Sequence, residues 1–125
     1  MSIKAFDHIN IRTANVEKMT AWYSDVLGLK PGPRPDFDFP GAWLYLNGQA
    51  LVHLVGVPSD PVNEDPKLEH FALSAAGMGA FRDRLTELNV PWREARLAEI
   101  GVVQLNIHDP DGNHIHVDFD LSKEA

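Results

Sequence analysis

The segment Asp109-Pro110-Asp111-Gly112-Asn113-His114-Ile115-His116-Val117-Asp118-Phe119 is the part of the chain from which its architecture is best understood. Its first four residues are typical of a tight turn, because proline fixes φ and glycine permits a positive φ. Alternating apolar and polar residues follow, which predicts a strand. One face of this strand is apolar, and the other carries His114, His116 and Asp118. Such a polar face needs a polar partner, and the rest of the chain suggests a metal ion.

The elements that precede this turn form a regular series. Residues 68–75 are strand-like, and apolar residues at helical spacing from Met78 to Leu88 predict a helix that ends near Asn89. Residues 92–95 are a candidate short strand, and residues 102–107 are a clear one. The second half therefore predicts a strand, a helix and then two or three antiparallel strands.

The first half shows the same order. Residues 6–12 alternate and predict a strand with one largely polar face. An apolar stripe then predicts a helix, with Asn15 as its expected N-cap and Gly28 at its end.

The remainder of the first half predicts a hairpin between two connectors. Residues 30–40 carry four prolines and are expected to form a loop. Residues 42–46 and 50–55 are two predicted strands joined by Asn47-Gly48, a strong hairpin signal. Residues 58–66 are expected to connect the halves.

The histidines show that the two halves are a repeat. His8 and His70 open the halves 62 residues apart, while His53 and His116 lie in the last strands 63 apart. A duplicated βαβββ unit explains this spacing better than chance. We therefore predict an α+β fold in which two tandem βαβββ modules form a cupped, barrel-like mixed sheet. Residues 1–125 would be a single domain with repeats at about 5–57 and 67–120.

Composition excludes several classes of protein. The chain carries 18 acidic and 11 basic residues and no basic block, which disfavours a nucleic-acid or anionic-membrane partner. It contains no cysteine, so disulfides, zinc-thiolate sites and thiol nucleophiles are excluded. No signal peptide or membrane span is recognisable, and a cytoplasmic location and a homodimer are predicted.

The matched histidines predict a metal centre. If the polar strand faces of the two halves converge, they bring together His8, His53, His70 and His116. Imidazole is a ligand for Zn, Ni, Co, Fe and Mn, so one divalent ion of this group is the expected cofactor. A single histidine on a strand is more often an ordinary hydrogen-bonded residue, but that alternative does not explain symmetric placement. His114 is the rival ligand to His116, and His108 is expected to be solvated.

Several motifs resemble the vicinal oxygen chelate superfamily, which includes glyoxalase I, extradiol dioxygenases, methylmalonyl-CoA epimerase, and fosfomycin- and bleomycin-resistance proteins. The resemblance covers nearly the whole chain. In the first half it rests on Asp7-His8-Ile9-Asn10-Ile11 and Trp22-Tyr23-Ser24-Asp25-Val26-Leu27-Gly28-Leu29. In the second half it rests on Leu68-Glu69-His70-Phe71-Ala72-Leu73 and on the Asp-Pro-Asp-Gly turn leading to His116.

The resemblance places the metal ligands on the same four histidines. His116 departs from the pattern, because most metal-using relatives have a glutamate there, and glyoxalase I usually has one at the position of His53 as well. The all-imidazole set therefore lacks the carboxylate that moves the substrate proton in glyoxalase I. It also lacks the carboxylate that completes the iron triad of extradiol dioxygenases.

Other polar and aromatic residues are candidates for substrate binding. The resemblance to glyoxalase I makes Arg12 a candidate anion clamp, with an ordinary exposed arginine as the alternative. The repeat places four more residues in the same concavity: Trp43, Tyr45, Gln104 and Asn106. Asp118 is a candidate to orient a histidine or act as a base, and a solvated strand end is the alternative. No residue is assigned a catalytic role.

The resemblance implies a divalent-metal-dependent enzyme acting on a small organic substrate that chelates through two oxygens. A glyoxalase-like lyase or isomerase is favoured, because of Arg12 and the four-ligand layout. The alternatives are a ferrous ring-cleaving dioxygenase and a metal-free protein that binds small molecules such as drugs. The sequence leaves open whether the site lies within one chain or between two.

Overall fold

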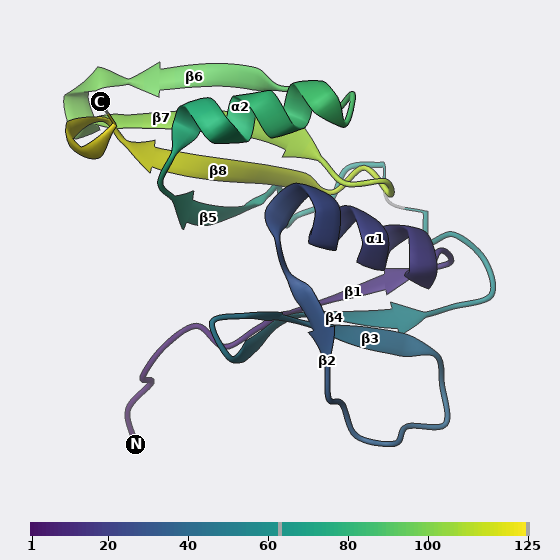
Figure 1. Cartoon of the computed structure of the whole chain (residues 1–125). Coiled ribbons are helices and arrows are strands. Elements are labelled where there is room, and N and C mark those ends of the chain that lie inside the picture. Colours follow the sequence, from purple (N-terminus) through teal and green to yellow (C-terminus); the bar gives the residue numbers. More distant parts are fainter. Residues whose placement is uncertain (63, 125) are drawn as a thin grey trace. The chain divides into compact units, whose positions relative to one another are not determined.

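Two compact units make up the chain, Met1–Glu64 and Asp65–Ala125. The computed structural model describes residues 1–62 and 64–124, and the two units have the same order of elements (Figure 1). The first contains β1 (Ile9–Thr13), α1 (Val16–Leu27), β2 (Lys30–Gly32), β3 (Gly41–Leu46) and β4 (Gln49–Gly56). The second contains β5 (Phe71–Ala75), α2 (Met78–Glu87), β6 (Arg93–Leu97), β7 (Val102–His108) and β8 (His114–Asp120), with short 3₁₀ turns at Ala98–Ile100 and Leu121–Lys123.

The sheets confirm the predicted α+β fold of two tandem βαβββ modules. The strand order is β1-β4-β3-β2 in the first sheet and β5-β8-β7-β6 in the second. In each sheet the first strand of the unit pairs in parallel with the last, and the other pairs are antiparallel. The first and last strands, which carry or adjoin the matched histidines, are therefore neighbours within each unit. That the modules together make one domain stays a prediction.

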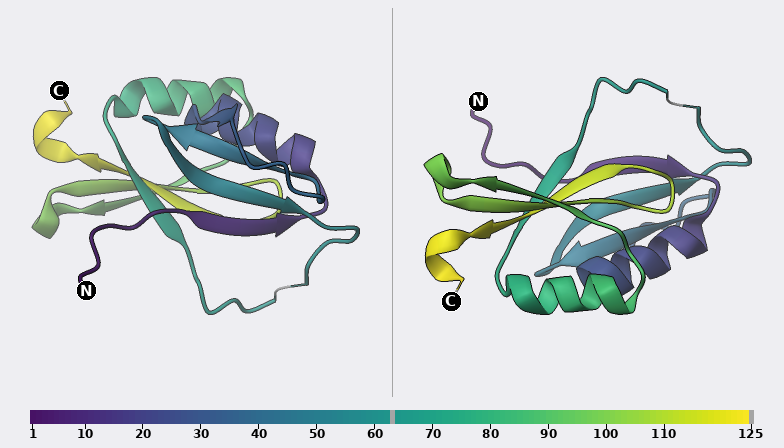
Figure 2. Two further views of the ribbon diagram at one scale, coloured as in Figure 1. Left: turned by 90° about the horizontal axis from the view of Figure 1, so that it is seen from below. Right: turned by 90° about the horizontal axis from the view of Figure 1, so that it is seen from above.

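The predicted start of α1 at Asn15 is correct, but the expected side-chain cap is not formed. Asn15 has a non-helical backbone, and its own N–H donates to the Thr13 hydroxyl at 3.0 Å. The predicted end at Gly28 is confirmed: this residue has φ 74° and donates its N–H to the Ser24 carbonyl. Figure 2 shows α1 running along the strands of its own unit.

The start of α2 is capped by a residue far away in the sequence. Gly77, at the N-cap, has no side chain that can accept from the first helical N–H groups. The Glu124 carboxylate accepts instead from the N–H of Gly77 at 3.0 Å and of Met78 at 2.6 Å. This carboxylate suits the positive end of the helix.

The two turns that the sequence indicated most strongly are present. Asn47 and Gly48 have φ of 51° and 81°, which the two central residues of a type I′ hairpin require, and they join β3 to β4. In the turn before β8, the buried Asp109 carboxylate accepts from the N–H groups of Asp111 and Asn113 and from the Asn113 side chain. Gly112 takes the positive φ of 88°.

Some predicted boundaries were wrong. The expected loop over residues 30–40 contains the short edge strand β2, which tolerates Pro31 because an edge strand leaves one side unpaired. The strand predicted over residues 68–75 begins only at Phe71, and the one predicted over 92–95 runs from Arg93 to Leu97.

Each unit has its own apolar core on the helix-bearing face of its sheet. The apolar face predicted for β8 is confirmed, since Ile115, Val117 and Phe119 are buried. The Phe81 ring of α2 lies 5.9 Å from the Phe119 ring. The core of the first unit includes Met19, Tyr23, Val26, Leu29, Leu44, Val52 and Leu54.

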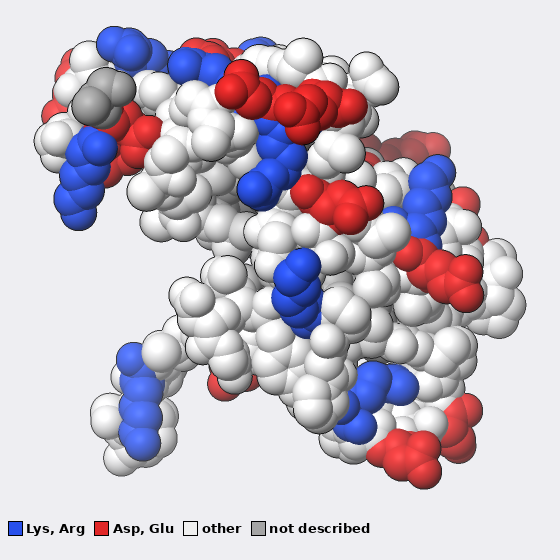
Figure 3. All heavy atoms as spheres, in the orientation of Figure 1, with Lys and Arg blue, Asp and Glu red and all other residues white. Residues whose placement is uncertain are grey.

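Charged side chains of both signs are mixed on the face shown in Figure 3, where lysine and arginine lie singly or in small groups among aspartate and glutamate. Across the described residues, no helix combines the length and apolar character needed to cross a membrane.

Candidate metal centre

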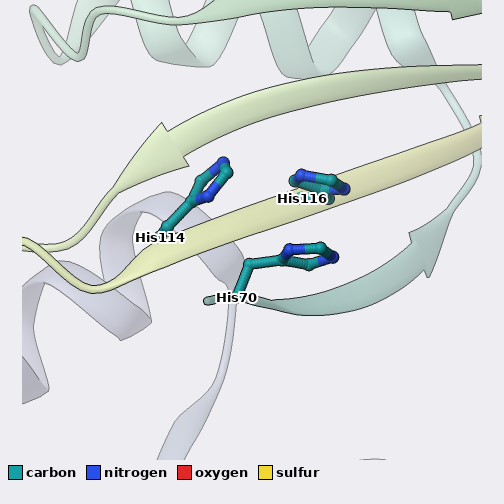
Figure 4. Close-up of side chains that lie close together, drawn as sticks. All are labelled: His70, His114 and His116. Carbon is teal, nitrogen blue, oxygen red and sulfur yellow. The ribbon is translucent and has the colours of Figure 1, made fainter. Parts of the chain in front are cut away.

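A pair of stacked imidazoles lies on the second unit. His70 immediately precedes β5 and His116 lies on β8; their ring centroids are 3.9 Å apart and the rings are nearly parallel, at 14° (Figure 4). The register explains this contact, because Ala72, two residues after His70, is the partner of His116. The His70 side chain is 37% exposed, whereas His116 is buried at 8%.

The first unit repeats this arrangement. His8 immediately precedes β1 and stacks on His53 of β4, with centroids 3.8 Å apart and an angle of 8°. Asn10, two residues after His8, is the partner of His53. The exposure also matches, at 38% for the His8 side chain and 8% for His53. The repeat inferred from spacing thus extends to side-chain geometry.

The exposed histidine of each pair is oriented by the acidic residue that precedes it. The Nδ1 atom of His8 lies 2.7 Å from an Asp7 carboxylate oxygen, and Nδ1 of His70 lies 2.5 Å from one of Glu69. A carboxylate only accepts, so Nδ1 carries the proton and Nε2 retains its lone pair. Ligand histidines are commonly oriented in this way by carboxylates.

The buried histidine of each pair is suited to binding as a neutral ring. The Nε2 atom of His53 donates to the Ala50 carbonyl at 3.1 Å, which leaves the Nδ1 lone pair free. The Nδ1 atom of His116 is buried and has no hydrogen-bond partner in residues 1–62 and 64–124. A buried polar atom without a partner calls for an explanation, and a bound cation is one.

Burial, reinforced by neighbouring histidines, lowers the pKa of both buried rings. For His53 the neighbour is His8, and for His116 the neighbours are His70 and then His114. The neutral form is therefore favoured, and metal ligation requires that form. The donor set fits a divalent cation: neutral imidazoles with an available lone pair, oriented by carboxylates or a backbone carbonyl.

His114 is near the second pair but is held by other contacts. Donor atoms of His70, His114 and His116 lie within 4.8 Å of one another, so the three could in principle bind one ion. However, Nδ1 of His114 lies 2.9 Å from Glu69 and its Nε2 lies 2.9 Å from the Asn106 side-chain oxygen. The amide of Asn106 is fixed in this orientation because its nitrogen donates to the Arg93 carbonyl. These contacts favour His116 over His114 as the ligand.

Glu69 joins the two sides of this cluster. Its two carboxylate oxygens bind His70 and His114, and these hydrogen bonds, led by that of His70, lower its pKa to about 2. Glu69 and Asp7 were not singled out from the sequence. A signal was present, since an acidic residue precedes the first histidine of each repeat.

The residues predicted to bind substrate have different surroundings. Trp43 stacks on His53, with centroids 4.0 Å apart and an angle of 15°. The Tyr45 hydroxyl donates to the Pro33 carbonyl, so it has a structural partner. Arg12 is exposed on β1. Asn106 is engaged by His114 and Arg93, as described above.

Gln104 and Asp118 face each other in the β7–β8 register. One carboxylate oxygen of Asp118 is buried and has no hydrogen-bond partner within the described part of the chain. Asp118 is thus not the solvated strand end that was the alternative, and a role in orienting a histidine or acting as a base stays a prediction. His108 is exposed, as expected, and its ring stacks on His114 at 5.0 Å.

The structure therefore brings the four predicted ligands together in two pairs, each within one unit. The pairing of His8 with His53 and of His70 with His116 is present. That a single ion binds both pairs stays a prediction.

Comparison with known proteins identifies the family. Residues 5–117 match the model of the Glyoxalase/Bleomycin resistance protein/Dioxygenase superfamily. The chain belongs to this superfamily. A manganese-dependent 2,3-dihydroxybiphenyl 1,2-dioxygenase from Geobacillus genomosp. 3 is 29% identical over 89% of the chain. The chain spans only 38% of the length of that relative.

Solved structures of the superfamily share the fold. A glyoxylase/bleomycin resistance protein/dioxygenase domain from Frankia sp. EAN1pec superposes with a TM-score of 0.79 at 18% identity, covering 95% of this chain and 93% of that one. The lactoylglutathione lyase of Agrobacterium tumefaciens gives a TM-score of 0.72 at 19% identity, covering 98% of each chain. At these identities the likeness supports the fold and does not select a reaction.

Proposed function

We propose that this protein is a divalent-metal-dependent enzyme that acts on a small organic substrate with two chelating oxygens. His8, His53, His70 and His116 would hold the ion. When bound, the ion would supply Lewis-acid polarisation and a template for the two oxygens. Zn, Ni, Co, Fe and Mn all suit an imidazole set, and we expect a cytoplasmic homodimer.

One observation carries this proposal: the two units repeat the same imidazole pair, including the carboxylate that holds its exposed ring. Each pair stacks an exposed ring, held by the preceding carboxylate, on a buried ring of the neighbouring strand. Histidines kept only for packing would not need the same ring spacing, exposure and carboxylate partner twice.

Within this class we favour a glyoxalase-like lyase or isomerase. Such a reaction moves a proton, and Asp118 offers a carboxylate oxygen without a partner in the described residues, two positions from His116 on the same strand face. Arg12, exposed on β1, is available to bind an anionic group of the substrate. Asp118 would thus replace the carboxylate that the all-imidazole set lacks.

A ring-cleaving dioxygenase is the second candidate, because the Geobacillus relative is named as a manganese-dependent dioxygenase. The two reactions differ in their need for oxygen, so substrate turnover under anaerobic conditions separates them. A lyase or isomerase continues without oxygen, whereas a dioxygenase stops and otherwise consumes oxygen in proportion to product.

Elemental analysis of protein purified without an affinity tag tests the proposal directly. We expect about one divalent ion per chain in the wild type. His8→Ala and His70→Ala should lose the ion, whereas His108→Ala, an exposed histidine outside both pairs, should retain it. Wild-type protein that neither contains nor takes up a stoichiometric ion would instead support the metal-free binding protein.

A further inference from the structure

The ring of His53 lies between two other rings. His8 stacks on it from β1, with centroids 3.8 Å apart and an angle of 8°. Trp43 stacks on it from β3, with centroids 4.0 Å apart and an angle of 15°. Because β4 lies between β1 and β3 in the sheet, the two neighbours contact opposite faces of the imidazole. Both flat faces of His53 are therefore covered.

The backbone places Trp43 in this position. Trp43 is the partner of His53 in the antiparallel register of β3 and β4, and side chains directly opposite each other in such a pair are in contact. The half-buried indole is supported on its other side by the Phe37 ring at 6.4 Å, over which the Arg34 guanidinium carbon lies at 5.0 Å. Gly41 leaves room for Arg34, since a Cβ there would lie 3.1 Å from its Nη2 atom.

The edge of the His53 ring is held as well. Its Nε2 donates to the Ala50 carbonyl at 3.1 Å. Rotation of the ring by half a turn about its Cβ–Cγ bond would break this hydrogen bond and turn Nδ1 to the opposite side. The ring cannot make this rotation unless one of the stacked neighbours moves. A stacked aromatic pair and a neutral hydrogen bond contribute similar free energies, so the Trp43 stack should matter about as much as the hydrogen bond.

The second unit differs from the first at this position. Asn106 is the partner of His116 in the register of β7 and β8, as Trp43 is of His53. The Asn106 side chain binds His114, whose ring meets His116 edge-on at 66°. The two units therefore keep the pair of histidines but not the stacked indole. A function confined to the first unit explains why a large aromatic residue is present there.

We propose that Trp43 is a positioning residue of the metal centre, which holds the His53 ring so that Nε2 donates to Ala50 and Nδ1 keeps its lone pair for the ion. This inference rests on the proposed function, because it takes His53 as a ligand. Trp43 acts through His53 and needs no contact with substrate, which was the role predicted for it. The orientation of the ring does not depend on the ion, so it can be measured in metal-free protein.

Nuclear magnetic resonance of the metal-free protein at pH 8 tests the proposal. Burial lowers the pKa of His53, so its ring is neutral there, and two-bond ¹⁵N–¹H spectra show which nitrogen carries the proton. The wild type should show the Nε2–H tautomer. In Trp43→Leu the ratio of this tautomer to the Nδ1–H form should fall at least about fivefold, whereas Trp43→Phe, which keeps a flat ring, should retain it. Trp22→Leu, which removes a half-buried indole from α1, should leave the ratio unchanged.

Metal affinity, measured by competition with a chelator, gives the second readout. Trp43→Leu should weaken binding of Zn²⁺ about tenfold, and Trp43→Phe much less. An unchanged tautomer ratio in Trp43→Leu would overturn the proposal, as would a shifted ratio with unchanged affinity. If Trp43→Leu does not fold, Trp43→Met replaces it, because methionine fills irregular space without providing a flat ring. A wild type that binds no divalent ion would refute the proposed function, and the tautomer ratio would still decide whether Trp43 orients His53.

Discussion

The Nδ1 atom of His70 lies 2.5 Å from a carboxylate oxygen of Glu69, the residue that precedes it in the chain. The same carboxylate also binds His114, so it fixes two rings beside the buried His116. This relationship explains how an exposed histidine can present a defined lone pair.

Glu69→Gln should weaken metal binding. The substitution retains the shape of the side chain but removes the charge, and loss of such partners typically reduces metal affinity about 10–100-fold. Competition with a chromophoric chelator measures the change. Glu99→Gln, which alters an exposed acid of the same unit, should leave the affinity unchanged. Equal affinities of wild type and Glu69→Gln would show that Glu69 does not orient a ligand.

Substitutions at His114 and His116 should show which of these two histidines binds the metal. His116→Ala removes a proposed ligand and should reduce metal affinity at least about 100-fold, whereas His114→Ala should reduce it less than about tenfold. His116→Glu should retain metal, because a carboxylate oxygen is also a ligand for these ions, and proton-transfer activity could be gained. The opposite ranking in equilibrium dialysis would make His114 the ligand.

The metal-free protein should lose stability on mild acidification. Burial lowers the pKa of His53 and His116 in the folded state, whereas the unfolded chain titrates its histidines near about 6.5. Between these values the unfolded chain binds more protons, so the free energy of unfolding falls as the pH drops below about 6.5. Glu69 contributes little in this window, because its carboxyl is ionised both in the folded state, where its pKa is about 2, and in the unfolded chain, where it titrates near about 4.3.

Urea denaturation at pH 7.5 and 5.5 measures this effect. The wild-type midpoint should be lower at pH 5.5, and the difference should shrink in His53→Asn/His116→Asn. A difference that is the same in both proteins would assign the pH dependence to other groups.

Asp109→Ala should destabilise the turn before β8. Its buried carboxylate accepts two backbone N–H groups and one side-chain amide, and their loss should lower the free energy of unfolding by about 3 kcal/mol. Thermal or urea unfolding measures the change. Asp111→Ala, in the same turn but exposed, should change stability by less than about 0.5 kcal/mol.

Glu124→Ala should loosen the first turn of α2. The carboxylate satisfies two N–H groups that no nearby side chain satisfies, and losing such a cap typically costs about 1 kcal/mol. Hydrogen exchange at Gly77 and Met78 should accelerate, whereas Lys123→Ala should leave it unchanged. Unaltered protection in Glu124→Ala would mean that this cap contributes nothing in solution.

The sequence predicted the structure correctly where neighbouring residues determine the backbone conformation and where both halves keep the same spacing. Asn47-Gly48 specified a hairpin because both residues accept a positive φ, and the alternation around His116 specified which side of β8 is buried. The spacing of the four histidines also predicted the repeat, and each half places its two histidines in a matching stacked pair.

Features that depend on a distant partner were not predictable. The strand β2 has three residues, including Pro31, and exists because β3 pairs with it. Glu124 is separated by 47 residues from Gly77, so no local pattern reveals that it caps α2. Likewise, the stacking of Trp43 on His53 depends on the register between β3 and β4, which no local pattern reveals.

Gly41 has a consequence for how the loop before β3 tolerates substitution. Its lack of a side chain keeps the beginning of β3 against the Leu54 carbonyl and leaves room for Arg34, whose guanidinium carbon lies 5.0 Å from the centre of the Phe37 ring. Any larger residue would force this strand end to move, and the loop with it. A single exchange at Gly41 should therefore alter the backbone of the whole loop, although Gly41 itself contributes no side-chain contact to it.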